Sequence, residues 1–107
     1  MHAHNVYFSL KDKSSEALEQ FIADSKLYLA VNTGIKSFAC GVLEVELDRE
    51  VNDQDFDVSL HVLFESRKAH DAYQIAPSHN EFVARNKDNW AAVRVFDSAV
   101  KYQFSLG

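Results

Sequence analysis

The chain has 107 residues, 47% of them hydrophobic and only three of them glycine, which excludes a disordered protein and suits a single domain spanning 1–107. The formal net charge of -5 argues against nucleic acid as a partner, because phosphate binding requires clustered Lys and Arg. No apolar run approaches the roughly 20 residues that cross a bilayer, and the lone Cys40 excludes an internal disulfide. Since the N-terminus shows no basic and apolar leader, the sequence predicts a protein of the reducing cytoplasm, away from membranes.

The start of the chain predicts a strand followed by a helix. His4 to Leu10 alternates with the period of two expected of a strand, and both of its faces are partly apolar. Ser14 or Ser15, followed by two glutamates, is typical of a helix start, and the helical pattern continues to about Ala30. The residues expected on the buried face of this helix are Leu18, Phe21, Ile22, Ser25 and Leu29.

Two further strands are predicted on either side of an acidic connection. Ile35 to Leu47 alternates like a strand, and its parity shifts midway, which predicts a bulge near Gly41-Val42. Glu44 to Asp57 carries seven acidic residues and one basic residue, Arg49, so this connection is expected to be exposed. Phe56 to Glu65 then alternates apolar and polar residues, which predicts a third strand.

A proline separates two short helices in the second half of the chain. Because Pro77 lacks an N–H and suits the first helical position, Ala76 is expected to end one helix and Pro77 to open the next. The second helix is predicted to reach about Asn89. His79 lies in its first turn, where the positive end of the helix dipole favours the neutral imidazole.

The remaining elements complete a sheet. Ala91 to Phe96 predicts a fourth strand, and Val100 to Leu106 alternates as a further extended segment. The order β-α-β-β-α-α-β is the split βαβ pattern of an α+β, ferredoxin-like antiparallel sheet with helices on one face. The other face needs a cover, so we predict a homodimer that pairs two sheets, with the C-terminal segment crossing to the partner. The residues expected on the uncovered face are Tyr7, Phe38, Cys40 and Val62, or their neighbours of opposite parity.

The segment Tyr73-Gln74-Ile75-Ala76-Pro77-Ser78-His79, followed by Phe82, resembles the Tyr-x-x-His-Pro-x-His signature of the stress-responsive dimeric α/β-barrel (Dabb) family. Ala76 stands where the family usually has its first histidine. Weaker similarity covers most of the chain and includes His4 to Asp12 and Val93 to Asp97. The resemblance implies a dimeric α/β barrel. It also implies a possible activity, because one plant branch, polyketide cyclases resembling olivetolic acid cyclase, uses a Tyr and a His at the positions of Tyr73 and His79 for an intramolecular aldol condensation.

The candidate site combines His79 and Tyr73, as candidate catalytic residues, with His4 at the start of the first strand. Its walls are expected to be apolar, and a mostly hydrophobic pocket with a few polar groups is typical of a small-molecule site. In a catalytic pocket, His79 would accept a proton from a carbon next to a carbonyl, and Tyr73 would donate a hydrogen bond to the enolate oxygen. The wall residues are expected to be Val6, Phe8, Ile22, Val58, Leu60, Trp90, Val93 and Val95.

Metal, thiol and nucleotide chemistry have less support. No metal site is predicted, because the five histidines show no short ligand spacing and two of them lie near a terminus expected to be mobile. Cys40 has no basic neighbour to lower its pKa and is expected to be buried and inert. No phosphate-binding glycine loop occurs, so no cofactor is predicted. The five histidines are His2, His4, His61, His70 and His79.

Three functions remain open at this point. The first is a binding protein for a small hydrophobic or carbonyl-containing molecule in a pocket between sheet and helices. The second is a cyclase-like or lyase-like acid-base enzyme without a cofactor, and the third is a purely structural stress-response dimer. An open cavity that presents His79 would favour the first two, whereas an interior filled by side chains would favour the third.

Overall fold

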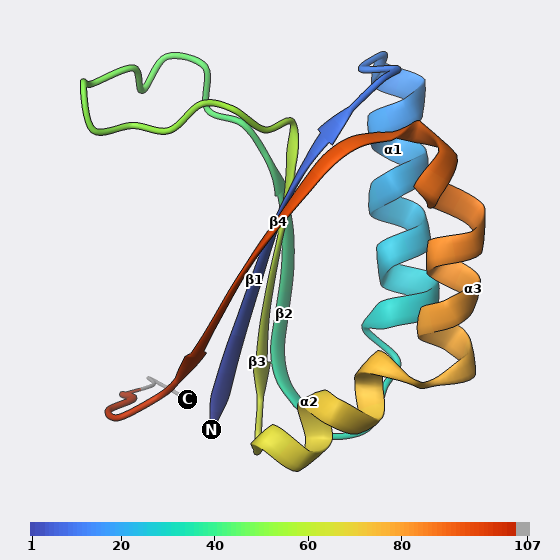
Figure 1. Ribbon diagram of the computed structural model, residues 1–107, viewed down its shortest axis with the longest axis vertical. Helices are drawn as coiled ribbons and strands as arrows, with labels where there is room; N and C mark the ends of the chain where they lie inside the picture. Colours follow the sequence, from blue (N-terminus) through green and yellow to red (C-terminus); the bar gives the residue numbers. More distant parts are fainter. Residues whose placement is uncertain (105–107) are drawn as a thin grey trace.

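The structure is a computed structural model that describes residues 1–104, and it consists of one antiparallel sheet with helices packed on one of its faces (Figure 1). The strand order is β2-β3-β1-β4, so the predicted α+β ferredoxin-like fold is confirmed. No helix in this part of the chain is long and apolar enough to cross a bilayer. The elements are β1 (His2–Leu10), α1 (Ser15–Asp24), the π-helical turn η1 (Ser25–Leu29), β2 (Ile35–Val42), β3 (Val58–Phe64), α2 (Arg67–Gln74), α3 (Pro77–Asn86), the 3-10 turn η2 (Lys87–Asn89) and β4 (Trp90–Ala99).

The central strand β1 determines which side chains enter the core. It pairs with β3 on one side and with β4 on the other, and its even-numbered residues are all buried beneath the helices. The residues that pair with these buried positions lie on the same face of the sheet, as Leu60 and Val95 do on either side of Val6. The core is therefore one apolar layer between sheet and helices, made of Val6, Phe8, Leu10, Phe21, Leu29, Val58, Leu60, Val62, Phe64, Tyr73 and Phe82.

The predicted buried face of α1 needs one correction. Phe21, Ser25 and Leu29 are buried as expected, but Ile22 is 37% exposed. The inward position beside Phe21 is taken by Asp24, whose carboxylate accepts hydrogen bonds from Asn86 and Arg85 of α3. Because α3 packs against the Asp24 side of α1, Ile22 is left at the solvent edge.

The second strand is shorter than predicted. β2 ends at Val42, and its register shift lies between Ile35 and Ser37 rather than near Gly41. The chain then leaves the sheet as a loop, residues 43–57, on the side away from the helices (Figure 1). The loop is held by an ion pair between Arg94 and Asp53, whose Nη1 and Oδ2 lie 2.7 Å apart.

The face of the sheet opposite the helices differs in part from the prediction. Tyr7 lies on it as expected and packs edge-on against the rings of Phe56 and Phe96. Phe38, Cys40 and Val62 instead face the core, so for these three the second alternative of the prediction holds and their neighbours of opposite parity lie on the uncovered face. The uncovered face therefore mixes aromatic and polar side chains.

The ends of the last two strands also differ from the predicted ones. β3 begins at Val58, so Phe56 precedes the strand, and β4 runs from Trp90 to Ala99, longer than predicted. Residues 100–104 are not a strand, although the Val100 N–H still donates to the Met1 carbonyl. The rest of the predicted C-terminal segment, residues 105 and 106, lies outside the described part of the chain.

Candidate functional site

The junction between α2 and α3 positions the two candidate catalytic side chains. Ala76 has an extended ψ of 143° and Pro77 is the first helical residue, so His79 lies in the first turn of α3 as predicted. The hydroxyl of Ser78 donates to the Asn32 Oδ1 at 3.0 Å, which connects this turn to the segment that follows η1. Tyr73 is buried near the end of α2. Two short helices separated by a proline thus bring His79 and Tyr73 into contact.

A cavity of about 160 Å³ lies between the sheet and the helices. It is lined by most of the residues predicted for the site, including His79, Tyr73 and His4. Two of the predicted wall residues do not line it, because Ile22 is turned toward solvent and Val58 is fully buried within the core. The predicted residues that do line the cavity are His4, Val6, Phe8, Leu60, Tyr73, His79, Trp90, Val93 and Val95.

His79 and Tyr73 form an edge-to-face pair, with ring centroids 4.8 Å apart and planes at 70°. Burial lowers the pKa of His79, and the nearby imidazoles of His4 and His70 lower it further. Burial also raises the pKa of the Tyr73 phenol, so the phenol keeps its proton at neutral pH. The pair therefore offers a neutral imidazole beside a protonated phenol, which is the arrangement that a base and a hydrogen-bond donor require.

Two buried polar atoms in residues of the cavity wall lack a hydrogen-bond partner among residues 1–104. They are Nδ1 of His79 and Nε1 of Trp90. Leaving a buried polar group unpaired costs about 1–3 kcal/mol, so native proteins rarely leave such groups without a compensating role. Two residues that line the cavity thus each contain a buried polar atom without a partner in the described part of the chain.

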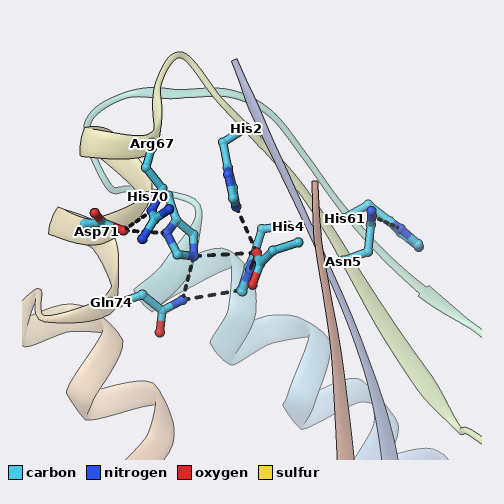
Figure 2. Close-up of polar contacts among 9 residues, drawn as sticks. His2, His4, Asn5, His61, Arg67, His70, Asp71 and Gln74 are labelled. Atoms are coloured by element: carbon cyan, nitrogen blue, oxygen red, sulfur yellow. Dashed lines mark hydrogen bonds and ion pairs between the residues drawn. The ribbon is translucent and has the colours of Figure 1, made fainter. Parts of the chain in front are cut away.

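A second group of ionisable residues gathers beside the cavity, at the end of the sheet where β1 begins (Figure 2). The Asp97 Oδ1 accepts hydrogen bonds from His2 Nε2 at 2.9 Å and from His4 Nδ1 at 2.6 Å, and His70 Nε2 lies 3.6 Å from the same oxygen. Three histidines therefore converge on one carboxylate although the sequence shows no short ligand spacing among them. His2 and His4 are buried strand residues rather than part of a mobile terminus.

The remaining histidine lies elsewhere. His61 is on the opposite face of the sheet, where one ring nitrogen lies 2.9 Å from the Asn5 Oδ1 (Figure 2). Its other ring nitrogen lies 3.0 Å from the Ser59 Oγ. Its alternation in β3 predicted this separation. Cys40 is half-buried, and burial raises the pKa of its thiol while a hydrogen bond with Ser25 opposes the rise.

Several site residues were not anticipated from the sequence. Leu29, Gln74, Phe82 and Val83 also line the cavity. For Gln74 a signal existed, because it lies one helical turn after His70 and their side chains meet 3.4 Å apart. Asp97 could be found only from the strand register, in which it pairs with His4.

Two larger hollows, each of about 430 Å³, lie outside this region. One, near the start of α1, is lined largely by polar residues such as Asp12, Glu16 and Asp88. The other lies on the uncovered sheet face between Tyr7, Phe56 and Phe96. Neither contains a pair like His79 and Tyr73.

The split βαβ sheet, the proline-separated helices and the His–Tyr pair define a ferredoxin-like α+β domain with a site between sheet and helices. Residues 3–100 match the Stress responsive A/B Barrel Domain (Dabb) family, so the chain belongs to this family. The resemblance seen in the sequence is thereby confirmed at the level of the family. No curated protein matches the chain.

Solved structures share the fold over nearly the whole chain. A protein from Arabidopsis thaliana is 25% identical, with a TM-score of 0.79 over 99% of this chain and 100% of its own. A dimeric ferredoxin-like protein of unknown function from Thermobifida fusca is 20% identical, with a TM-score of 0.75 over 92% and 90%. A hydroxynitrile lyase from Passiflora edulis is 19% identical, with a TM-score of 0.76 over 97% and 96%.

Proposed function

We propose that the protein binds a small, largely hydrophobic molecule that carries a carbonyl group, in the cavity between sheet and helices. The observation that carries this proposal is the pair of unpartnered buried atoms, His79 Nδ1 and Trp90 Nε1, in an otherwise mostly apolar wall. The indole N–H can only donate a hydrogen bond, so its partner must be an acceptor such as a carbonyl oxygen. The presence of a cavity also argues against a purely structural role.

The cavity size limits the ligand. A cavity of roughly 150 Å³ holds benzene, whereas pockets for drug-sized molecules are about 300–1,000 Å³. At about 160 Å³, the cavity suits a molecule with one aromatic ring. Val93 and Val95 are 42% and 50% exposed, so the wall beside β4 is incompletely covered and is the side from which a ligand would enter.

We also propose that two chains pair through the uncovered sheet faces, as the dimeric relatives suggest. Support comes from apolar side chains left exposed on the face away from the helices and on the loop beyond it. Phe96 is 53% exposed, and Val45, Leu47 and Val51 of the loop are 69%, 55% and 83% exposed. We further propose a cytoplasmic location, which the free thiol of Cys40 supports.

An acid-base enzyme is the second candidate, and the neutral His79 beside Tyr73 is the observation that favours it. In this mechanism the imidazole takes a proton from a carbon next to the carbonyl, and the phenol stabilises the enolate oxygen. The similarity to a hydroxynitrile lyase fold makes cleavage of a hydroxynitrile a second reaction to test, in which the imidazole would take the hydroxyl proton while the carbonyl forms and cyanide leaves. A long linear polyketide, as the cyclase branch would need, exceeds the cavity, and Ala76 replaces a histidine of the signature.

Ligand binding can be followed with the protein's own fluorophore, because Trp90 is the only tryptophan and lines the cavity. We expect benzaldehyde and acetophenone to change its emission and to bind more tightly than toluene and ethylbenzene, the matched hydrocarbons. In calorimetric titrations, Trp90→Phe should lose most of this preference, a factor of roughly 2 to 12, because one hydrogen bond is worth about 0.5–1.5 kcal/mol. Equal binding of carbonyl compounds and hydrocarbons, or of neither, would contradict the proposal.

The enzyme and the dimer need separate measurements. Turnover of mandelonitrile or of short β-keto compounds by the wild type, abolished in His79→Ala, would establish the enzyme, whereas binding without turnover would leave a ligand carrier. Sedimentation equilibrium should show a dimer for the wild type and a monomer for Phe96→Asp, since the substitution places a charge in the proposed interface. A monomeric wild type at micromolar concentration would exclude the sheet-to-sheet pairing.

A further inference from the structure

The structure holds a candidate metal site beside the ligand cavity. We propose that His2, His4, His70 and Asp97 bind one divalent ion of the zinc class, through three imidazole nitrogens and one carboxylate oxygen. One ligand atom from each of the four residues lies within 4.8 Å of the others. They come from three elements: β1 supplies two, α2 one and β4 one, and Figure 2 shows the labelled His2, His4 and His70 turned toward a common point.

The orientation of His70 is the strongest single observation. Its Nδ1 lies 2.9 Å from a carboxylate oxygen of Asp71, and because a carboxylate can only accept, Nδ1 of the ring donates. In the neutral ring, Nε2 then carries a lone pair, and this atom faces the Asp97 Oδ1 at 3.6 Å. Two electron-rich atoms directed at each other are stabilised by a cation between them.

The same arrangement is typical of metal-binding histidines. Such a histidine usually donates its remote N–H to a carboxylate, which fixes the ring and directs the other nitrogen at the metal. Asp71 supplies that carboxylate, and the guanidinium Nε of Arg67 holds it in turn at 2.9 Å. The amide nitrogen of Gln74 lies 3.4 Å from Nε2 of both His4 and His70 and can donate to these lone pairs, so the Gln74 side chain would turn away from His70 when an ion binds there.

The spacing of the ligand atoms suits a small tetrahedral ion. Metal bonds of about 2.0–2.1 Å place tetrahedral ligand atoms about 3.3–3.4 Å apart. Around the Asp97 Oδ1, the three nitrogens lie at 2.9, 2.6 and 3.6 Å, which brackets that separation. Shifts of the ligand atoms on the order of 1 Å, which small side-chain rotations can produce, are therefore enough to reach tetrahedral spacing.

The ligand types select the ion. Three imidazoles and one carboxylate suit Zn²⁺ and its neighbours, whereas Ca²⁺ and Mg²⁺ prefer shells made of oxygen and Cu⁺ prefers sulfur. The side chain of Asp97 is 40% exposed, so an ion can enter from solvent, while His2 and His4 are 8% and 6% exposed and hold it within the fold. With four protein ligands, the site is of the closed type whose role is structural. Zinc would fasten α2 and both strands at this end of the sheet.

The test is a calorimetric titration of the full chain with ZnCl₂, after removal of any affinity tag and treatment with a chelator. We expect one ion per chain, and a higher midpoint of thermal unfolding with Zn²⁺, because the ligands converge only in the folded state. Binding should weaken at least tenfold in His70→Gln and in Asp97→Asn, and Asp71→Asn should also weaken it by about tenfold through the orientation of His70.

The matched control is His61→Gln, which removes a histidine from the other face of the sheet and should leave zinc binding unchanged. Because a variant can fail to fold, the wild type gives an independent readout with Co²⁺, whose intense visible absorption reports tetrahedral coordination. One tetrahedral Co²⁺ per chain, displaced by Zn²⁺, supports the site. No binding at about 100 micromolar ZnCl₂, which corresponds to a binding free energy weaker than about 5.5 kcal/mol, would overturn it. Equal affinity in His70→Gln, or loss of affinity in His61→Gln, would overturn it as well. This outcome is independent of the carbonyl titrations.

Discussion

Replacing Gly34 by alanine should destabilise the fold strongly, although the change adds only one methyl group. Gly34 has a φ of 89°, a left-handed conformation that residues with a Cβ adopt at a cost of about 1–2 kcal/mol. A Cβ built on it would lie 2.6 Å from the Cβ of Ala69 in α2. Ordinary carbon contacts are about 3.5–4.0 Å, and such overpacking costs about 1–3 kcal/mol. The sum is about 2–5 kcal/mol.

This perturbation also reaches the site, because α2 carries both Tyr73 and His70. For a chain of this size each kcal/mol lowers the unfolding midpoint by roughly 4–8 °C, so a loss of about 2–5 kcal/mol in Gly34→Ala should lower the midpoint by about 8–40 °C. Differential scanning calorimetry at one protein concentration measures this. The matched control is Gly41→Ala, whose new Cβ would meet only the Ser59 Oγ at an ordinary 3.5 Å.

A double substitution separates the two causes. Ala69→Gly removes the methyl group that the new Cβ would meet, at a cost of about 1 kcal/mol for glycine in a helix. If the contact matters, Gly34→Ala combined with Ala69→Gly should be more stable than the sum of the single effects predicts. Additive effects would assign the whole cost to the backbone, and a Gly34→Ala protein as stable as Gly41→Ala would refute both parts of the reasoning.

Three further changes have defined outcomes. Ser14→Ala removes the hydroxyl that accepts from the Ala17 N–H at the start of α1 and should cost about 1 kcal/mol in urea unfolding, whereas Ser14→Asp should retain most of the stability. The pKa of His79 is lowered in the folded chain, so the unfolded chain binds a proton first as the pH falls through about 6.5, and the free energy of unfolding should decrease below that pH. Urea unfolding at about pH 7.5 and 5.5 should show a smaller decrease for His79→Gln than for the wild type. The raised pKa of Cys40 should make iodoacetamide react several-fold more slowly with the folded chain than with the urea-unfolded chain, and equal rates would contradict this.

The sequence predicted the elements well where local chemistry determines them. The alternation of β1 and β3 and the helix start at Pro77 were sufficient, because a period of two and a missing N–H act within a few residues. The end of β2 was not predictable in this way. Val45 and Leu47 continue the apolar alternation, but the strand they extend has no neighbour there, and both side chains are exposed.

Part of the candidate site could be predicted from the sequence, and part could not. His79, Tyr73 and most of the cavity wall followed from the signature and from strand parity. The group formed by His2, His4, His70 and Asp97 did not, because its members are separated by up to 95 positions and meet only through strand register and the placement of α2. Ligand spacing in the sequence detects metal sites within one element, and this group is built across three.

Asp97 does not line the cavity, but it contacts His4, which does. Its carboxylate accepts from Nδ1 of His4, so in the neutral ring Nε2, which faces Gln74 in the cavity wall, is an acceptor. If an ion binds Nδ1, as proposed above, that proton would move to Nε2 and the acceptor would become a donor. His4 would then couple the proposed metal site to the cavity, because the protonation of Nε2 would depend on whether an ion occupies Nδ1.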